Sequence, residues 1–535
     1  MKKPKFRKPS SGIKGKDWMR FKPYNKFGPY DQKYVRIASQ VNEVLKEHRD
    51  FLDDVLESDP EEYSSLAITL TSYLEDLVNE IGIWKVFTDQ NEELYGYPIP
   101  FMEEESMEEY EAGDLNYEDV KYLIWHFLNT HINSIFAPDS AFLMDLAADV
   151  TEVLDDSWDE APVSDFYDEY LTFQDDIDLY KLKHKLTWFA LHSYPVFKEA
   201  QEKFDEKMEK IYSQNSGNLN LDIISQYTYM IMDEQVYIQR FSYNAMTTFD
   251  WFAPLMRGSE SARELCLGLK KHVSGSFEWV ETNDTHMLVK YVGKEKTFSI
   301  TVDSFGTIMT PEPGNILYMR IVPFRDDWFL SGMASVHKKD EKGFQNPTYP
   351  PFHVNSHEEQ ESFLKNIKRM EEDFKTFFGS LFYLTKDDEE LVTKFTDYTQ
   401  FQYNNRRTKE NDLPEFDYEK SLTQHRQLMS DQQGTAIAFI PNQGVMLEDG
   451  ISEWLEKLEN LDQVSKEDNG DLLFHLSYEV YPENLTYILD HYTPNAPLKL
   501  DVKFTELDFW PFLPFFSRYC QPHNYHPRTP RMVAS

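Results

Sequence analysis

The sequence predicts an α+β fold, with an acidic multi-helix N-terminal domain, a small antiparallel β module and a mixed α/β C-terminal region. Changes in hydrophobic periodicity support this prediction. Apolar residues recur every three or four positions over 31–270, alternate with polar residues over 271–337, and show both patterns over 357–535. Residues 338–356 are polar and contain several prolines and glycines, so we predict a linker there.

The first strong helix signal in the predicted helical domain is Asp59 followed by Pro60. This pair places an N-cap carboxylate before a proline at the first helical position. The apolar residues that follow are three or four positions apart and define one buried face: Leu66, Leu70, Leu74, Leu77 and Ile81. We therefore expect an amphipathic helix from about residue 60.

Two further helices are expected in the same domain. One begins at Asn116, with Asp119 placed to reach back and cap it. On a helical wheel His131 lies in the middle of the apolar face of this helix, whereas His126 lies opposite. The other covers 175–194 and is expected to end at the proline that follows, after which the helical pattern resumes to about residue 211.

The β module is predicted from alternating apolar residues and turn signals. Residues 287–291 and 297–302 alternate, and a turn rich in proline and glycine precedes 316–322, which is apolar on both faces and is expected to be a central strand. Residues 326–327 predict a hairpin turn into 328–333. About five short antiparallel strands predict a small sheet or a partial barrel.

The C-terminal region mixes both patterns. Helices are predicted over 357–378, 451–460 and 483–491, a hairpin over 435–447, and a strand over 498–504. This mixture gives the third part of the predicted fold.

Charge and composition limit the class of protein. The chain carries 93 Asp and Glu against 54 Lys and Arg, a formal net charge of −39. A surface of this sign repels phosphate backbones and anionic lipid. Two cysteines rule out a disulfide scaffold and fit a reducing compartment, and no apolar run reaches the ~18 residues of a membrane span. We expect an acidic cytoplasmic protein that does not interact with membranes.

Residues 1–30 form a basic arm, with ten Lys or Arg and one acid, interleaved with aromatic residues. The candidate partner-binding residues in this arm are Lys14, Lys16, Trp18, Arg20 and Lys22. The arm could dock on the acidic helical domain, bind an acidic partner, or bind nucleic acid through stacked bases. Residues 1–36 carry a net charge of +10, so the remaining −49 argues against nucleic acid and favours docking within the chain.

Several stretches resemble an uncharacterised bacterial family, a domain of unknown function found in acidic intracellular proteins. The matching stretches include Lys16-Asp17-Trp18, Tyr73-Leu74-Glu75-Asp76, Gly82-Ile83-Trp84, Glu118-Asp119, Tyr318 to Phe324, and Asp508-Phe509. They extend from the start of the chain nearly to its end. The resemblance implies no activity, cofactor or catalytic residues.

Two sets of residues are candidates for a metal site. Glu80 lies at the edge of the first helix's apolar face, where it could meet His131, but carboxylate–histidine sites in helical bundles use paired motifs that are absent here. A buried histidine with a single acceptor is the favoured interpretation. Cys520, His523 and His526 have a spacing that zinc accepts, yet a structural site needs a fourth ligand, so this hypothesis is also weak.

The search for catalytic motifs leaves two hypotheses. Asp501 and Lys503 alternate on a predicted strand as in some metal-dependent nucleases, but a solvent-facing strand explains the pattern equally. No phosphate-binding loop or nucleophile elbow is present, and no cofactor is predicted. The leading hypothesis is a non-catalytic protein-binding or adaptor protein. The alternative is a metal-dependent hydrolase, acting on nucleic acid, that uses Glu80, His131, Asp501 and Lys503.

Overall fold

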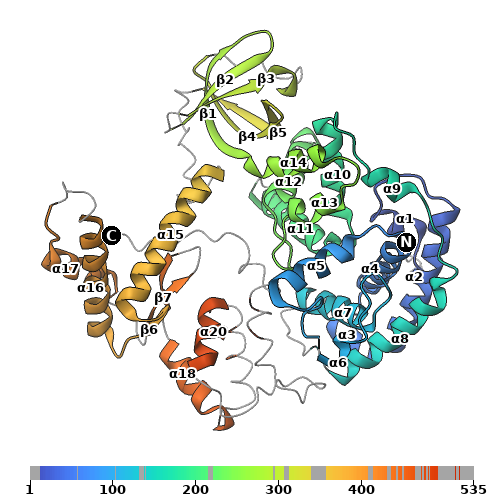
Figure 1. Cartoon of the computed structure of the whole chain (residues 1–535), viewed down its shortest axis with the longest axis horizontal. Coiled ribbons are helices and arrows are strands. Elements are labelled where there is room, and N and C mark those ends of the chain that lie inside the picture. The colour runs from blue at the N-terminus through green and yellow to red at the C-terminus, as the bar shows by residue number, and fades with distance from the viewer. Residues whose placement is uncertain are drawn as a thin grey trace, which may run out of the picture. The chain divides into compact units, whose positions relative to one another are not determined.

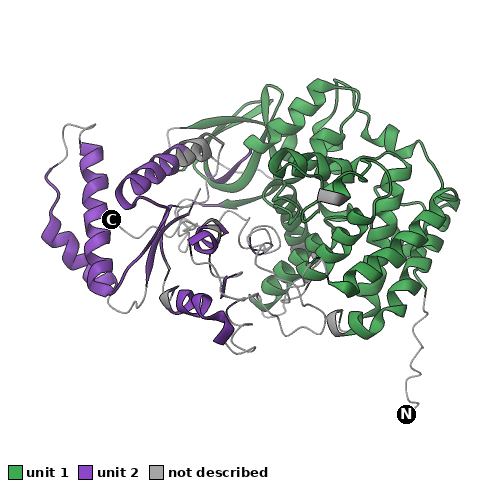
Figure 2. Ribbon diagram, turned by 60° about the horizontal axis from the view of Figure 1, so that its bottom comes forward, with its two compact units in different colours: residues 1–271, 277–336 green, residues 272–276, 337–535 purple. Residues whose placement is uncertain are grey.

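The computed structural model confirms the α+β class, with 61% helix and 15% strand. It describes residues 12–56, 58–102, 104–131, 138, 140–214, 221–292, 296–305, 313–338, 357–407, 414–429, 435–440, 444–448, 451–463, 472, 475–476, 480, 482–491, 513 and 517. The chain divides into two compact units (Figure 2). Unit 1 comprises 1–271 and 277–336, and unit 2 comprises 272–276 and 337–535.

The larger part of unit 1 is a body of helices (Figure 1). Its helices are α1 (Gly15–Met19), α2 (Pro29–Glu47), α3 (Arg49–Val55), α4 (Pro60–Val78), α5 (Ile83–Tyr95), α6 (Glu104–Met107), α7 (Tyr117–His131), α8 (Ala141–Trp158), α9 (Phe166–Leu171), α10 (Leu179–His192), α11 (Phe197–Gln214), α12 (Leu221–Tyr237), α13 (Thr248–Leu255) and α14 (Glu260–Gly268). As predicted, the Asp59 carboxylate caps α4 by accepting the Glu61 backbone N–H at 2.8 Å.

Helices α4 and α7 lie at the centre of this body, since α4 packs against α2, α5, α7 and α8. The prediction that His126 lies on the polar side of α7 is wrong. Its side chain is buried and its ring stacks on Tyr243 with centroids 3.8 Å apart. A helical wheel assumes one solvent-facing side, but the described residues 119–129 of α7 are all buried.

A five-stranded closed barrel, in the strand order β1-β2-β3-β5-β4, forms the rest of unit 1, except that the first residues of β1 and the last residue of β5 belong to unit 2. Its strands are β1 (Val273–Thr282), β2 (His286–Tyr291), β3 (Thr297–Thr301), β4 (Ile316–Phe324) and β5 (Asp327–His337). The prediction of five strands is confirmed, but they are not all antiparallel. Strands β3 and β5 pair in parallel, with Ile300 opposite Trp328. In the strand order, β5 therefore lies between β3 and β4. This order is that of an OB-type Greek-key barrel.

The turn between β4 and β5 lies one residue earlier than predicted, at residues 325–326. Arg325 adopts a φ of +56°, a left-handed conformation that tight two-residue hairpins require. The sequence offers no glycine or asparagine at this position, so the turn could not be placed from residue preferences alone.

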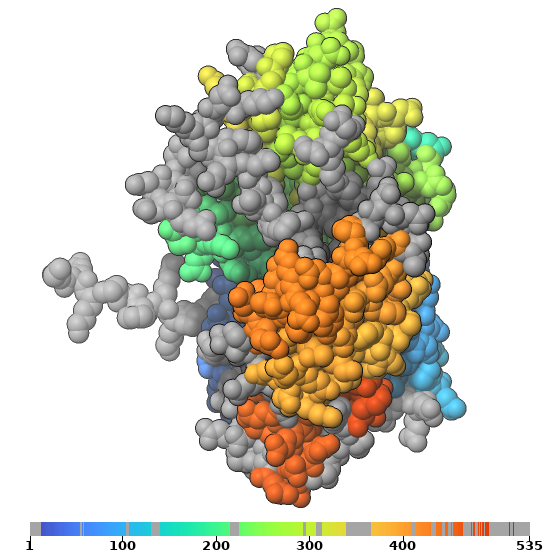
Figure 3. All heavy atoms as spheres, turned by 90° about the vertical axis from the view of Figure 1, so that its left-hand side faces the viewer, coloured from blue at the N-terminus to red at the C-terminus, as the bar shows by residue number. Residues whose placement is uncertain are grey.

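Unit 2 combines a small sheet with helices. Its described elements are α15 (His357–Phe378), β6 (Phe382–Leu384), α16 (Asp388–Arg407), α17 (Tyr418–Leu428), β7 (Ala436–Ile440), β8 (Gly444–Glu448), α18 (Ile451–Glu459) and α20 (Pro482–His491). The predicted helices and the hairpin are confirmed. The sheet is antiparallel with β7 in the middle, and its core includes Phe374, Tyr398 and Phe439. Figure 3 shows the outer face of α15–α17 in orange. The predicted strand 498–504 lies outside the described residues.

None of the described helices combines the length and apolar composition that crossing a membrane requires.

Candidate functional site

The basic arm, over its described residues from 12 onward, is folded into unit 1. Trp18 is fully buried, and its indole Nε1–H donates to Asp31 Oδ1 at 3.1 Å. The Tyr24 hydroxyl donates to the same oxygen at 2.8 Å, and the Gly28 backbone N–H donates to Asp31 Oδ2 at 2.8 Å. The Asp31 carboxylate therefore links α1, the loop that follows it and the start of α2 through hydrogen bonds.

A buried ion pair fixes the arm to α4. Lys22 and Glu75 are paired, and both side chains are 2% exposed. The Lys22 ammonium lies 3.6 Å from the centroid of the Trp18 ring, and the Tyr30 hydroxyl donates to Glu75 Oε1 at 3.0 Å. Burial lowers the pKa of Lys22 and raises the pKa of Glu75. Trp18 and Lys22 are thus engaged inside unit 1 and do not reach a surface where a partner would bind.

Arg20 is also engaged within unit 1. Its guanidinium pairs with Glu61 Oε1 at 3.0 Å and donates to Gln201 Oε1 at 2.6 Å. Its backbone carbonyl lies 2.8 Å from His192 Nδ1. Part of the arm therefore docks on the helical body, in agreement with the first of the three explanations.

Three lysines lie at the surface in the part of the arm that the structure describes, residues 12–30. Lys14, Lys16 and Lys26 are exposed, and none of them forms an ion pair with another described residue. Phe27 is 43% exposed and its ring packs against Gly15, which lies between Lys14 and Lys16. These contacts bring the start of α1 beside the loop before α2. We call Lys14, Lys16, Lys26 and Phe27 the basic surface.

The other strongly perturbed titratable groups of unit 1 are buried and serve its architecture. Asp76 of α4 accepts the backbone N–H groups of Gly82, Ile83 and Trp84 at 2.7–3.0 Å, and the Tyr194 hydroxyl at 2.9 Å. It therefore caps the N-terminus of α5 from a neighbouring helix. Burial raises its pKa to about 6.

Asp119 does not act as the predicted capping residue of α7. Its carboxylate accepts the Tyr73 hydroxyl at 2.6 Å and the Tyr110 hydroxyl at 3.2 Å, and it is 1% exposed. Burial raises the pKa of Asp119 to about 6. The Asp119 carboxylate therefore accepts from the Tyr73 hydroxyl, 46 residues away in sequence, and not from a backbone N–H at the start of α7.

The raised pKa of Asp119 predicts a pH-dependent contribution to stability. A carboxyl with a folded pKa of about 6 binds its proton more tightly in the folded state than in the unfolded one. The stabilisation is complete below the unfolded pKa of about 3.9 and is lost as the pH rises through about 6. Relative to Asp119→Asn, the wild-type free energy of unfolding should fall by about 2 kcal/mol between about pH 4 and pH 7. Denaturant titrations at both pH values measure it.

The control for this prediction is Asp145→Asn, which removes an exposed carboxylate on α8. As an exposed surface substitution it should stay within about 0.5 kcal/mol of wild type. The same difference between Asp119→Asn and wild type at pH 4 and at pH 7 would contradict the prediction.

A third buried cluster joins the barrel to the helices within unit 1. Asp233 of α12 pairs with Lys183 at 2.7 Å and with Arg320 of β4 at 2.5 Å, and accepts the Ser331 hydroxyl of β5 at 2.7 Å. Burial alone would raise the pKa of Asp233, but Arg320 and Lys183 outweigh it and hold the pKa below its usual value. Asp233 also raises the pKa of Lys183 above its ordinary value against the effect of burial. The lysine therefore stays charged and does not act as a general base for Ser331.

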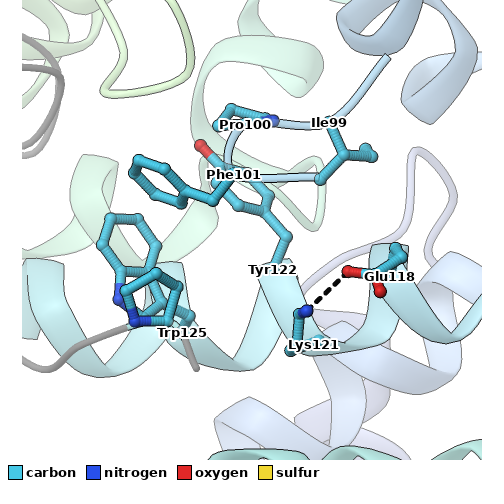
Figure 4. Close-up of a pocket in the computed structure, with 8 residues that line it drawn as sticks. Ile99, Pro100, Phe101, Glu118, Lys121, Tyr122 and Trp125 are labelled. Atoms are coloured by element: carbon cyan, nitrogen blue, oxygen red, sulfur yellow. Dashed lines mark ion pairs between the residues drawn. The ribbon is translucent and has the colours of Figure 1, made fainter. Parts of the chain in front are cut away.

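A small pocket lies over α7, and Figure 4 shows its lining. The Phe101 and Trp125 rings meet edge to face at 5.0 Å, and Lys121 pairs with Glu118 at 2.7 Å. The free volume is about 10 Å³, which is about the space that one water molecule needs. This pocket is too small for a metabolite.

The structure does not show the predicted metal ligands close to one another, because most of them are not described. Glu80 is exposed in the turn after α4, with a φ of +49°, and its carbonyl accepts from Arg257 at 2.5 Å. His131 is the last residue of α7, and its side chain is not described. The other candidates lie outside the described residues: Asp501, Lys503, Cys520, His523 and His526. The described part of the chain contains no group of three His, Cys, Asp or Glu that could hold a metal ion.

Lys26 and Phe27 belong to the basic, aromatic arm that the sequence indicates, but they were not among the candidate partner-binding residues. One local signal was available, since Gly28-Pro29 begins α2 and places Phe27 in the loop just before a helix. The contact between Phe27 and Gly15 connects residues 12 positions apart and has no such signal.

The family comparison gives a match over the helical part of unit 1 and the start of the barrel. A family model described as "Protein of unknown function (DUF3843)" matches residues 13–283, which is just over half of the chain. This match confirms the predicted resemblance to an uncharacterised family. No curated protein and no solved structure shows significant similarity to the chain.

Proposed function

Because the chain belongs to the family of proteins of unknown function DUF3843, we propose its function from its own surface. It is a non-catalytic protein-binding module that binds an acidic polypeptide through the basic surface of Lys14, Lys16, Lys26 and Phe27. The observation that carries this proposal is that Lys26 and Phe27 are exposed neighbours in the chain and that exposed Lys14 and Lys16 flank Gly15, which the Phe27 ring contacts, in a chain of net charge −39.

Electrostatics supports an acidic partner. The three ammonium groups have no described carboxylate partner, so a partner's carboxylates can bind them without first breaking an ion pair among the described residues. The strongly acidic remainder of the chain repels a bulky polyanion. At physiological ionic strength this repulsion is screened beyond about 8 Å, so a short acidic segment can approach the basic surface.

The buried groups support a structural rather than a catalytic use of the ionisable residues in unit 1. Asp76 caps α5, Asp119 binds two tyrosine hydroxyls, and Asp233 pairs with two cations. Each carboxylate already has hydrogen-bond donors from its own unit. No described residue favours the hydrolase alternative over this interpretation.

The proposal is tested by affinity capture from the native cell extract, with the bound proteins quantified by mass spectrometry. The triple variant Lys14→Gln, Lys16→Gln, Lys26→Gln removes the three charges, and its retention of partners should fall about tenfold, because each exposed lysine–carboxylate contact contributes up to about 1 kcal/mol. The retained partners should carry acidic segments and elute with salt.

The matched control is Lys181→Gln, Lys210→Gln, Lys271→Gln, which removes the same charge from exposed lysines of unit 1 away from the basic surface. This control should retain partners as wild type does. If the two triple variants behave alike, the basic surface is not the binding site.

A further inference from the structure

The half-exposed Phe27 ring lies against a glycine. A Cβ atom on Gly15 would lie 2.7 Å from Cε2 of the Phe27 ring, so no other residue leaves room for the ring in its present place. Gly15 does not have a positive φ, so its backbone conformation does not require glycine. The missing side chain at this position therefore accommodates the half-exposed ring.

The remaining aromatic residues of the arm are used inside unit 1. Trp18 and Phe21 are buried, and Phe21 packs on Phe197 with centroids 4.1 Å apart. The hydroxyls of Tyr24 and Tyr30 donate to the buried carboxylates already described. Phe27 is thus the arm's one strongly exposed aromatic side chain among the described residues.

We propose that Phe27 is the apolar anchor of the basic surface, and that the partner is an acidic polypeptide segment with an apolar or aromatic side chain between its carboxylates. This inference rests on the proposed function and names the chemistry of its partner. Exposed lysine–carboxylate pairs are individually weak, whereas an aromatic side chain adds a large apolar contact area to them.

The geometry favours a polypeptide over single-stranded nucleic acid. Binding of successive bases uses several stacking rings along a groove. Among the described residues of the arm a single aromatic ring is strongly exposed, and it lies against Gly15 between two lysines at the start of a short helix. A single ring suits one apolar side chain of a peptide.

The test measures binding of two synthetic peptides to the full chain by fluorescence anisotropy. Both peptides carry the same number of glutamates separated by glycines, and one has a single central tryptophan. Wild type should bind the tryptophan peptide about tenfold more tightly than the other. Phe27→Ala should abolish this difference.

A second variant guards against an indirect effect of the alanine substitution. Gly15→Ala keeps Phe27 but forces its ring to shift, so it should weaken the preference for tryptophan. Tyr212→Ala removes another exposed aromatic side chain, on α11, and should leave the preference intact. Circular dichroism and melting temperature establish that each variant is folded.

The outcomes separate the two proposals. If neither peptide binds wild type, the proposed function fails, and the anchor with it. If both peptides bind equally and Phe27→Ala changes nothing, the anchor is wrong while the basic surface stands. Tighter binding of a single-stranded oligonucleotide than of either peptide would overturn the assignment of a polypeptide partner.

Discussion

Replacing Asp233 with asparagine should lower the free energy of unfolding of unit 1 by about 3–5 kcal/mol. The substitution leaves Lys183 and Arg320, whose side chains are 12% and 11% exposed, as two cations without their shared carboxylate. Breaking a buried ion cluster in this way costs more than removing it as a whole. Calorimetry of the full chain, with the transition of unit 1 resolved from that of unit 2, gives the measurement.

Asp145→Asn is the control for charge, since it removes an exposed carboxylate from α8 and should change the stability by less than about 0.5 kcal/mol. A change of less than about 1 kcal/mol in the free energy of unfolding of Asp233→Asn would be close to that expected for the control. This result would show that the cluster does not fix the barrel to the helices.

Replacing Lys22 with methionine should destabilise unit 1 by a similar amount, about 3–5 kcal/mol near neutral pH. The substitution leaves Glu75 buried and charged, with the Tyr30 hydroxyl as a remaining donor. Because burial raises the pKa of Glu75, the carboxyl becomes neutral as the pH falls. The cost of Lys22→Met should therefore be smaller in acid than near neutral pH, and denaturant unfolding at two pH values measures it.

A double-mutant cycle isolates the pair. Lys22→Met combined with Glu75→Gln should be less destabilised than the sum of the two single variants, because no buried charge is left. Additive single effects, or a Lys22→Met variant as stable as wild type near neutral pH, would contradict a buried ion pair at this position.

Local sequence signals predicted much of the fold. The Asp59-Pro60 cap of α4, the helix α15 and the β7–β8 hairpin depend on residues close in sequence, and each is present. The parallel β3–β5 pair was missed because strand order depends on contacts that close the barrel, and alternation of apolar residues does not encode them.

The candidate site was predicted only in part. The sequence indicated that the arm is basic and that part of it docks on the acidic body. It could not distinguish the exposed Lys16 from the buried Lys22, because burial of Lys22 depends on Glu75, which is 53 residues away. The same limit applies to Asp119, whose tyrosine partner lies on another helix. Local charge patterns identify an arm, but only tertiary contacts show which of its side chains remain available.

The most direct test is the rate of chemical acetylation of each lysine in the folded chain, with and without the acidic tryptophan peptide, followed by mass spectrometry. Lys22 should stay unmodified in both conditions, while Lys14, Lys16 and Lys26 should react quickly alone and slowly with the peptide. Exposed Lys210 should react quickly throughout. Fast modification of Lys22, or equal protection of Lys210 and Lys16 by the peptide, would contradict the division of the arm into a buried part that contains Lys22 and the exposed basic surface.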